Sequence, residues 1–398
     1  MTAAGVLLVA FAAPMLGATG YLVLLSLLSR RARAPEPRPP HLRFDIVVPA
    51  HDEARGIAAT IASLRAVDYP SELYDIVVGA DNCTDDTAER ARAGGARVLV
   101  RDEPSRRGKG YGLAYAFERI LAEGRASAVV VVDADTIVSK NLLRVFAAHL
   151  DAGASAVQAD YAIRNIEASW RTRLLAVAFA SVHTLRSLAR SRLRLSCGLR
   201  GNGMCFTTSL LAAVPYDAFS IVEDLEYGIR LGALGHRVHY AGEAQVYGDM
   251  PAGERQSRTQ RRRWEAGRAR MARLHAMRLL VRGVRARDRI SLDLAMDLLI
   301  PPLATLVALT AVGLGASAAL SWWAGHVVLG GWLWLGCAVG LGVYGLRGWQ
   351  LSGTGARGLA GLIFVPAYVV WKIVLLLRRS SHPNGEWVRT AREEGEAP

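Results

Sequence analysis

Two carboxylates, Asp133 and Asp135, stand two residues apart in the run VVVVDADT. They follow four valines, which are typical of a buried strand, and alternate side chains of an extended chain point the same way. Both carboxylates can therefore face one site, and such a pair suits a hard cation, Mg²⁺ or Mn²⁺, that bridges diphosphate oxygens. The alternative is a strand-end turn that caps the following helix, which a D-x-D triplet alone does not exclude.

Polar residues also follow two other β-branched runs. Asp52 and Glu53 come after FDIVVPA, where Pro49 helps to end the run, and Asp81 and Asn82 come at the end of YDIVVGAD. Because ligands of open α/β sheets bind beyond the carboxyl ends of the strands, we expect these residues to line one site. Helix capping is the alternative for each of them taken singly.

Two later segments suit phosphate binding and proton transfer. The segment RRGKG, residues 106–110, can offer backbone N–H groups and the Lys109 ammonium to a phosphate, with a surface loop as the alternative. In SIVEDLEYGIRL, Glu223 and Asp224 stand at the start of a helical pattern, where a carboxylate can act as a general base. Acids at helix starts are also common because of the helix dipole.

The run QRRRW contains Gln260, Arg263 and Trp264. An indole beside guanidinium groups can stack on a sugar and neutralise a departing diphosphate. The alternative is a basic helix that faces a membrane, which accounts for some of the neighbouring arginines.

The elements that would position these residues alternate along the chain. Short β-branched runs separated by helical patterns imply crossover connections and a mostly parallel sheet of the α/β class. The sequence predicts strands at 44–50, 74–81, 96–101 and 127–135 and helices at 56–67, 84–93 and 111–123.

Apolar segments flank this stretch. Residues 1–29 carry no charged side chain, which predicts a transmembrane helix at about 5–29. Basic residues follow the run, which favours an uncleaved anchor with its N-terminus outside over a signal peptide. Residues 294–344 predict a transmembrane hairpin. The segment 359–377 precedes a basic tail, which favours a re-entrant or interfacial segment over a third C-terminal span.

Charge and cysteine content narrow the functional classes. The 398 residues have a mean hydropathy of +0.20 and a formal charge of +13, and much of the charge lies beside apolar runs, as in cytoplasmic juxtamembrane segments. No basic motif with interleaved aromatic residues accompanies it, so we expect no nucleic-acid partner. The four cysteines form no C-x-x-C pair, which predicts neither a zinc site nor a disulfide framework.

Taken in order, the motifs PAHDE, ADNCTDDT, RGKG, DAD, the GNG segment around Asn202, VED and QRRRW resemble the inverting glycosyltransferases of family 2, which have a GT-A fold. The similarity covers about residues 43–265. The flanking apolar segments resemble those of the membrane-integrated branch that makes cellulose, hyaluronan, chitin oligomers and poly-N-acetylglucosamine. His51 and Asp52 stand where many relatives have Asn before the Glu, and VED replaces Thr-Glu-Asp, so the donor preference cannot be read from these motifs.

The resemblance implies a metal-dependent, inverting transfer from a nucleotide sugar, with a UDP-sugar expected, to a glycan or lipid acceptor. It implies that Asp224, with Glu223 beside it, is the catalytic base, and that Asp133 and Asp135 hold the Mg²⁺ or Mn²⁺. The expected nucleotide- and donor-binding residues are Pro49, Asp52, Glu53, Asp81, Asn82, Lys109, Asp133 and Asp135. The residues expected near the acceptor and the diphosphate are Asn202, Gln260, Arg263 and Trp264.

The QRRRW run favours elongation of a β-linked polysaccharide. Few C-terminal apolar segments and the lack of a clear gating-loop motif speak against processive export. The alternatives are transfer of one sugar to a lipid or polyprenyl-phosphate acceptor and a non-catalytic nucleotide-sugar-binding scaffold, which the retained Asp133, Asp135 and Asp224 disfavour.

The expected location is the inner or plasma membrane with the catalytic domain in the cytosol. The expected organisation is an anchor at 1–30, a linker at 31–42, a GT-A domain at 43–265, a basic amphipathic interface segment at 266–293, a hairpin at 294–346, a third apolar segment at 357–379 and a polar tail at 380–398.

Overall fold

The computed structural model describes residues 3–250 and 254–364, with the side chains of 254–263 left undescribed. Contacts divide the chain into two compact units. In the described part, one unit holds residues 31–165 and 190–298, and the other holds 3–30, 166–189 and 299–364.

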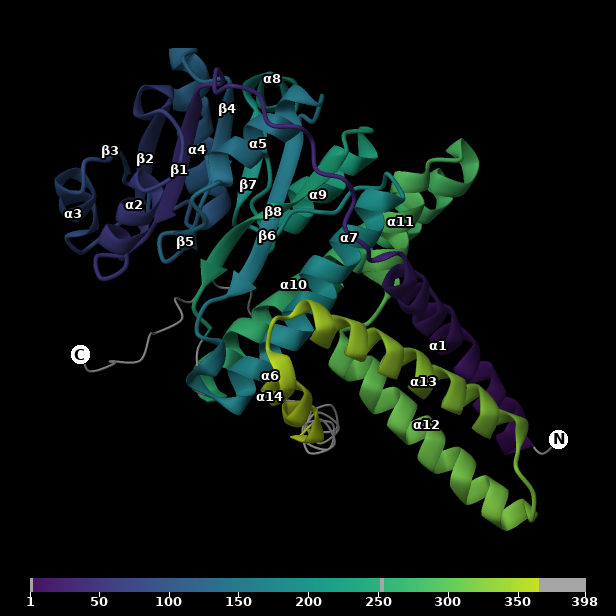
Figure 1. Ribbon diagram of the computed structural model, residues 1–398. Coiled ribbons are helices and arrows are strands. Elements are labelled where there is room, and N and C mark those ends of the chain that lie inside the picture. Colours follow the sequence, from purple (N-terminus) through teal and green to yellow (C-terminus); the bar gives the residue numbers. More distant parts are fainter. Residues whose placement is uncertain (1–2, 251–253, 365–398) are drawn as a thin grey trace. The chain divides into compact units, whose positions relative to one another are not determined.

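The first unit is built on an eight-stranded sheet (Figure 1). Its strands are β1 (Phe44–Ala50), β2 (Tyr74–Asp81), β3 (Arg97–Arg101), β4 (Ala128–Val131), β5 (Ile137–Val138), β6 (Ala156–Ile163), β7 (Met204–Thr207) and β8 (Val238–Gly248). The order is β3-β2-β1-β4-β7-β6-β8-β5. The first four neighbours are parallel, as predicted, but β7 runs antiparallel to β4 and β6, and β5 runs antiparallel to β8. The pair β6 and β8 is parallel as well, so four of the seven strand pairs in the described sheet are parallel. The α/β class is confirmed, and the mostly parallel sheet has two antiparallel strands, β5 and β7, which make it mixed.

The strand pairing decides which chain segments meet at one edge. Ala50 of β1 pairs with Ala80 of β2, and Val47 pairs with Val131 of β4, so the carboxyl ends of these strands share an edge. Met204, the first residue of antiparallel β7, also pairs with Val131. The residues that precede β7 therefore lie beside those that follow β4.

Helices cover both faces of the sheet. The helices α2 (Ile57–Arg65), α3 (Thr87–Ala93) and α5 (Leu142–Asp151) contribute to one buried cluster, in which Ile61 and Phe146 pack with Ile46 of β1. On the other face, α4 (Lys109–Glu123), α8 (Thr208–Ala213) and α9 (Glu223–Ala233) enclose aromatic contacts. Phe206 of β7 meets Phe117 and Tyr227 edge-on, with ring centroids 6.4 and 5.6 Å apart. The short helix η1 spans Ser71–Leu73.

Two further helices, α10 (Glu254–Ala286) and α11 (Arg289–Leu299), pack against α9. The sequence places the start of an apolar membrane stretch at Leu294, but Leu294 and Leu298 lie in a buried cluster with α9 and α10. The physical reason is that α11 carries two acidic side chains that have a buried cationic partner within this unit. Its buried Asp293 and Asp297 each lie 2.8 Å from the guanidinium of Arg190.

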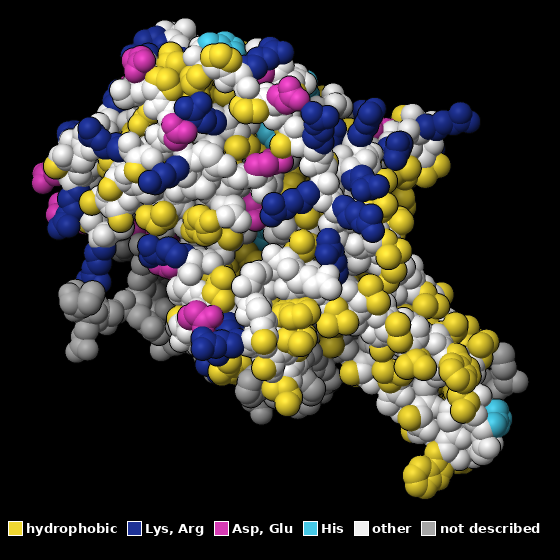
Figure 2. Space-filling view, viewed as in Figure 1, with side chains coloured by type: hydrophobic (Ala, Val, Ile, Leu, Met, Phe, Trp, Pro, Cys, Tyr) yellow, Lys and Arg dark blue, Asp and Glu magenta, His cyan; other side chains and the backbone are white. Residues whose placement is uncertain are grey.

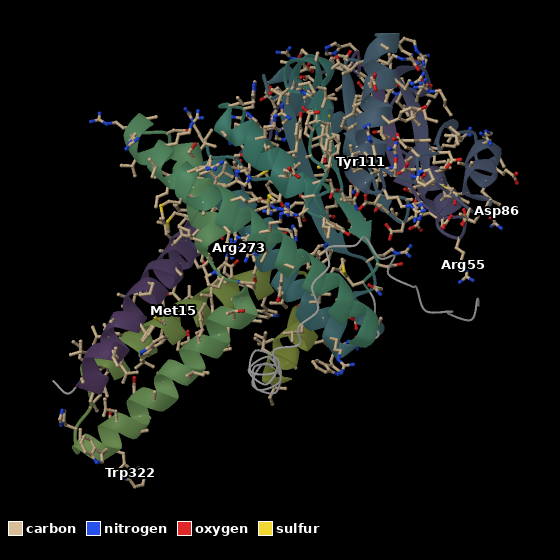
Figure 3. All side chains as sticks on the ribbon, turned by 180° about the vertical axis from the view of Figure 1, so that it is seen from behind. Met15, Arg55, Asp86, Tyr111, Arg273 and Trp322 are labelled. Atoms are coloured by element: carbon tan, nitrogen blue, oxygen red, sulfur yellow. The ribbon has the colours of Figure 1, made fainter. Side chains whose placement is uncertain are left out.

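Among the residues that the structure describes, the second unit contains three helices that are long and apolar enough to cross a membrane, judged by length and composition: α1 (Ala3–Leu28), α12 (Leu303–Ala324) and α13 (Leu329–Leu351). Figure 2 shows apolar side chains gathered over them. The indole N–H of Trp334 donates to the Leu8 carbonyl at 3.3 Å, which ties α13 to α1. Trp322, at the end of α12, is 89% exposed (Figure 3).

Residues 166–189 also belong to this second unit, although the sequence analysis predicts one continuous domain over residues 43–265. They form η2 (Ile166–Ala168), α6 (Trp170–Phe179), the π-helix η3 (Ala180–Leu185) and the start of α7 (Arg186–Arg192). The Tyr344 hydroxyl of α13 donates to the Ser181 carbonyl at 2.7 Å and accepts from Arg186 Nε at 2.9 Å.

The chain continues through α14 (Gly355–Gly361) and η4 (Leu362–Phe364). Most of the third apolar segment, from residue 365, and the polar tail lie outside the described residues.

Candidate active site

The two carboxylates of the DAD motif follow β4 directly. The strand ends at Val131, and Asp133 and Asp135 lie in a turn instead of the extended conformation that the sequence predicts. Asp133 is half-buried and Asp135 is exposed. A turn with an exposed carboxylate at its tip keeps hard oxygen ligands accessible at the sheet edge.

Asn202 fixes this turn from the neighbouring segment. It is fully buried, its side-chain oxygen accepts the backbone N–H of Asp133 at 3.1 Å, and its amide group donates to Thr136 Oγ1 at 2.7 Å. Gln158 of β6 in turn donates to the Asn202 carbonyl at 2.7 Å. Because a buried amide without partners is costly, these bonds specify one conformation of the DAD turn.

The glycines beside Asn202 allow the close approach. Gly203 has φ +67°, and a Cβ there would lie 2.9 Å from the Val246 side chain. Gly201 has φ +76°, and a Cβ there would lie 3.3 Å from Asp224 Oδ2. Both positions thus favour glycine for backbone conformation and for space.

Lys109, the first residue of α4, connects the site residues of three segments. Its ammonium donates to Asp133 Oδ1 and, at 2.6 Å, to the Gly201 carbonyl. It also lies 3.9 Å from Glu223 Oε1. Burial alone would lower the pKa of Lys109, but Asp133 and Glu223 raise it above its ordinary value, so the side chain stays cationic.

Glu223 and Asp224 begin α9 beside this lysine. Burial raises the pKa of both carboxyl groups, while the Lys109 cation opposes the rise. Asp224 further raises the pKa of Glu223. A carboxylate with a raised pKa is a better proton acceptor near neutral pH, which is what a general base requires.

A second group surrounds Asp81 at the end of β2. Its Oδ1 accepts from Arg101 at 2.6 Å and from Asn82 at 2.9 Å. Burial raises the pKa of Asp81, and Arg101 counteracts that rise. A Cβ on Gly112 of α4 would lie 3.5 Å from the Asp81 side chain, so the helix carrying Lys109 passes close to this carboxylate.

A third group closes the loops after β1 and β2. Asp52 accepts the Thr84 backbone N–H at 2.6 Å, and Asp85 accepts that of Thr87 at 3.0 Å. Ligand atoms of Asp52, Cys83 and Asp85 lie within 4.8 Å of one another. Their carboxylates accept these local hydrogen bonds, which hold the loops after β1 and β2 together at the predicted nucleotide site.

The remaining predicted residues are Pro49 and Glu53, at and after the end of β1, and three residues of α10. Pro49 pairs with Gly79 inside the sheet, and the Glu53 N–H donates to a threonine hydroxyl at 2.8 Å. Gln260 and Arg263 belong to α10, and their side chains lie outside the described part. Trp264 follows them on α10 and is exposed. The roles predicted for these three residues of QRRRW stay predictions.

The charge balance fits a divalent cation at the DAD turn. Asp133 and Glu223 lie beside Lys109, Asp224 follows Glu223, and Asp135 stands two residues after Asp133. The cations that act on these four carboxylates include Lys109 and, at Asp224, Arg200. Burial raises the pKa of the nearby Tyr161, and Asp133 and Asp135 raise it further, so both carboxylates act on the same buried environment. Oxygen ligands with excess negative charge are the donor set that Mg²⁺ and Mn²⁺ prefer.

Sequence reasoning missed several supporting residues. Gln158 is a polar residue inside the apolar strand β6, which is a detectable signal, and Arg200 precedes the GNG segment directly. The Arg200 backbone N–H donates to Gln158 at 2.8 Å, and its cation lowers the pKa of Asp224. Arg101 and Thr136 carried no comparable signal, because their partners Asp81 and Asn202 lie far away in the sequence.

Two curated relatives match about half of the chain. It is 23% identical over 232 residues to "Probable glycosyltransferase YdaM" of Bacillus subtilis, which covers 56% of this chain and 55% of that protein. It is 30% identical over 233 residues to the β-monoglucosyldiacylglycerol synthase of Synechocystis, and that match covers 54% of this chain and 47% of the synthase. The chain thus spans about half the length of these relatives.

Among solved structures, the mannosyltransferase PcManGT from Pyrobaculum calidifontis, in complex with GDP-Man and Mn²⁺, aligns with 93% of this chain and 99% of its own. The TM-score is 0.57 and the identity 18%, so the likeness concerns the fold, and together with the family match it confirms the predicted GT-A fold. Residues 39–267 match the family described as glycosyltransferase-like family 2. Since that match covers more than half of the 398 residues, this chain belongs to glycosyltransferase-like family 2.

Proposed function

We propose that this protein transfers a sugar from a nucleotide diphosphate sugar, with inversion at the anomeric carbon and with dependence on a divalent cation. The observation that carries the proposal is the position of Lys109, which touches Asp133 of the DAD turn and lies 3.9 Å from Glu223 at the start of α9. A donor-binding carboxylate and an acid pair suited to proton transfer are thereby next to each other.

The reaction is a single in-line displacement. The acceptor hydroxyl attacks the anomeric carbon, its proton passes to Asp224, and the bond from that carbon to the diphosphate oxygen breaks. The Lys109 cation beside Glu223 counteracts the rise in the pKa of the two carboxyl groups, so that Asp224 can be deprotonated before it accepts the proton. A bound Mg²⁺ or Mn²⁺, held by Asp133 and Asp135, would neutralise the departing diphosphate.

We infer that the nucleotide binds along the ends of β1 and β2. Asp52, Asp81 and Asn82 lie there, and parallel strands place ligands beyond their carboxyl ends. A UDP-sugar is the donor we propose. PcManGT holds GDP-Man, so GDP-sugars belong in the same donor test.

For the product we propose a β-linked glycan, on the basis of the QRRRW run at the start of α10. Transfer of one sugar to a lipid acceptor is the second candidate, because a relative 30% identical over 233 residues is described as a β-monoglucosyldiacylglycerol synthase. We further propose that α1, α12 and α13 span the inner or plasma membrane. Arg30, Arg31 and Arg33 after α1 support a cytosolic catalytic unit.

Labelled donor and membranes containing the protein distinguish the two products. A β-linked glycan appears as a high-molecular-weight ladder that a β-glycosidase degrades. One organic-soluble labelled species would contradict the glycan and support the lipid acceptor. Absence of both, beside an active control enzyme, would contradict sugar transfer.

Lys109→Met is expected to move the acid limb of the rate–pH profile to higher pH by about one unit or more, because a cation within about 4 Å lowers a carboxyl pKa by that order. Without the cation, the pKa values of Glu223 and Asp224 rise further. The active, deprotonated base then appears only at higher pH. The exposed Lys140, changed to Met, is the matched control. An acid limb at the wild-type position in Lys109→Met would refute the electrostatic role.

A further inference from the structure

The outer face of α10 carries an apolar stripe. Leu274, Met277, Val281 and Val284 are 49%, 62%, 40% and 64% exposed. Their spacing of three, four and three residues places them on one side of the helix. Contiguous exposed apolar residues of this kind mark an interaction site more often than an ordinary surface.

The inner face of α10 is already occupied. Met271 and Leu279 are buried with Val222 of the α9 N-terminus and Leu294 of α11. A Cβ on Gly267 would lie 2.6 Å from Val222 Cγ1, so α10 contacts the residue that caps α9 just before Glu223. The outer stripe is thus a second apolar face, separate from the core of this unit.

Arginines flank the outer stripe on both sides. No Asp or Glu occurs from residue 266 to 287. Figure 3 shows Arg273 on α10. The exposed arginines of this stretch include Arg270, Arg273, Arg278, Arg282 and Arg285.

The positive charge of these arginines distinguishes two possible partners of the outer stripe, a second copy of α10 and a lipid surface. A second copy of α10 would place arginine against arginine along a heptad-like seam, and like charges there are repulsive. Anionic headgroups attract such arginines, while the apolar stripe enters the boundary between headgroups and acyl chains. Only residues 300–302 separate α11 from α12, the next helix suited to crossing a membrane.

We propose that the outer face of α10 docks on a membrane surface rich in anionic lipid, and that docking holds α10, and through Gly267 and Val222 the start of α9, in the active position. The proposal rests on the membrane association proposed above. It adds that the lipid charge controls the rate of sugar transfer.

The full-length protein is reconstituted into phosphatidylcholine vesicles with or without about one third phosphatidylglycerol, and vesicle flotation is measured first. An environment-sensitive dye is placed on Met277→Cys in a Cys83→Ser background, with Leu234→Cys, at the exposed end of α9, as the control site. The dye at position 277 is expected to shift its emission to the blue only with phosphatidylglycerol. The emission of the dye at position 234 is expected to stay unchanged.

The triple variant Arg273→Gln, Arg278→Gln, Arg285→Gln is expected to lose this emission shift, and the triple variant Arg90→Gln, Arg92→Gln, Arg119→Gln is its control.

Donor turnover is measured in proteins that keep all their cysteines. Turnover is expected to rise several-fold with phosphatidylglycerol in the control variant and to stay unchanged in the α10 variant. Equal emission of the dye at position 277 in the two kinds of vesicle would overturn docking on anionic lipid. Self-quenching of that dye that depends only on the density of protein in the vesicle would indicate contact between two copies and would overturn it as well. A dye shift without a change in rate would overturn the coupling to α9. Failure to float would instead contradict membrane association itself.

Discussion

Asp224→Asn is expected to lower the rate of sugar transfer by about 10³-fold, within the range that general base catalysis supplies. Asparagine keeps the shape of the side chain, but its amide cannot take the proton of the acceptor hydroxyl. Donor binding is expected to stay nearly unchanged, because Asp224 lies at the start of α9 and not at the ends of β1 and β2. Steady-state rates and donor titration by calorimetry measure the two effects separately.

Asp217→Asn is the matched control for this substitution. Asp217 lies shortly before α9 and forms an exposed ion pair with Arg230 at 3.0 Å, which contributes little to stability. Its removal is expected to leave the rate near that of the wild type. Undiminished transfer by Asp224→Asn would rule out the assignment of the base, and Glu223→Gln would then be the next variant to measure.

Removal of divalent cations by a chelator is expected to lower turnover at least about 100-fold, because charge neutralisation by a metal ion is worth several kcal/mol in the transition state. Mn²⁺ or Mg²⁺ added in excess is expected to restore the rate. Asp133→Asn and Asp135→Asn are expected to raise the metal concentration needed for half-maximal rate.

The exposed Asp68, which pairs with Arg144, supplies the control variant Asp68→Asn. Its metal dependence is expected to match the wild type. Full activity in the chelator would exclude a metal role for the DAD turn. Lys109, which already touches Asp133, would then be the remaining candidate for neutralising the diphosphate.

Local patterns were sufficient to predict the first half of the sheet. The strands β1 and β2 match the predicted ranges residue for residue, because β-branched runs that end in polar or small residues mark both strand and boundary. The mixed order beyond β4 was not predictable in this way. Whether β7 pairs parallel or antiparallel with β4 depends on contacts between residues far apart, such as Asp133 and Asn202, which are 69 positions apart.

The site shows the same division. Carboxylates at strand ends and at the start of α9 were predictable from residue type and spacing. Their connections were not, since Lys109 meets the Gly201 carbonyl across 92 positions. Likewise, the apolar residues of α11 suggested a membrane span. Only contacts between distant residues, such as Leu294 with Ile229 of α9 and Asp297 with Arg268 of α10, show why that helix packs with α9 and α10.

The most direct test of the central claim is release of nucleoside diphosphate by the purified protein across a panel of UDP- and GDP-sugars, in Mn²⁺ or Mg²⁺. We expect release from at least one donor, with a UDP-sugar foremost, and we expect chelator or Asp224→Asn to abolish it. Release from no donor, or equal release by wild type and Asp224→Asn, would contradict the proposed sugar transfer.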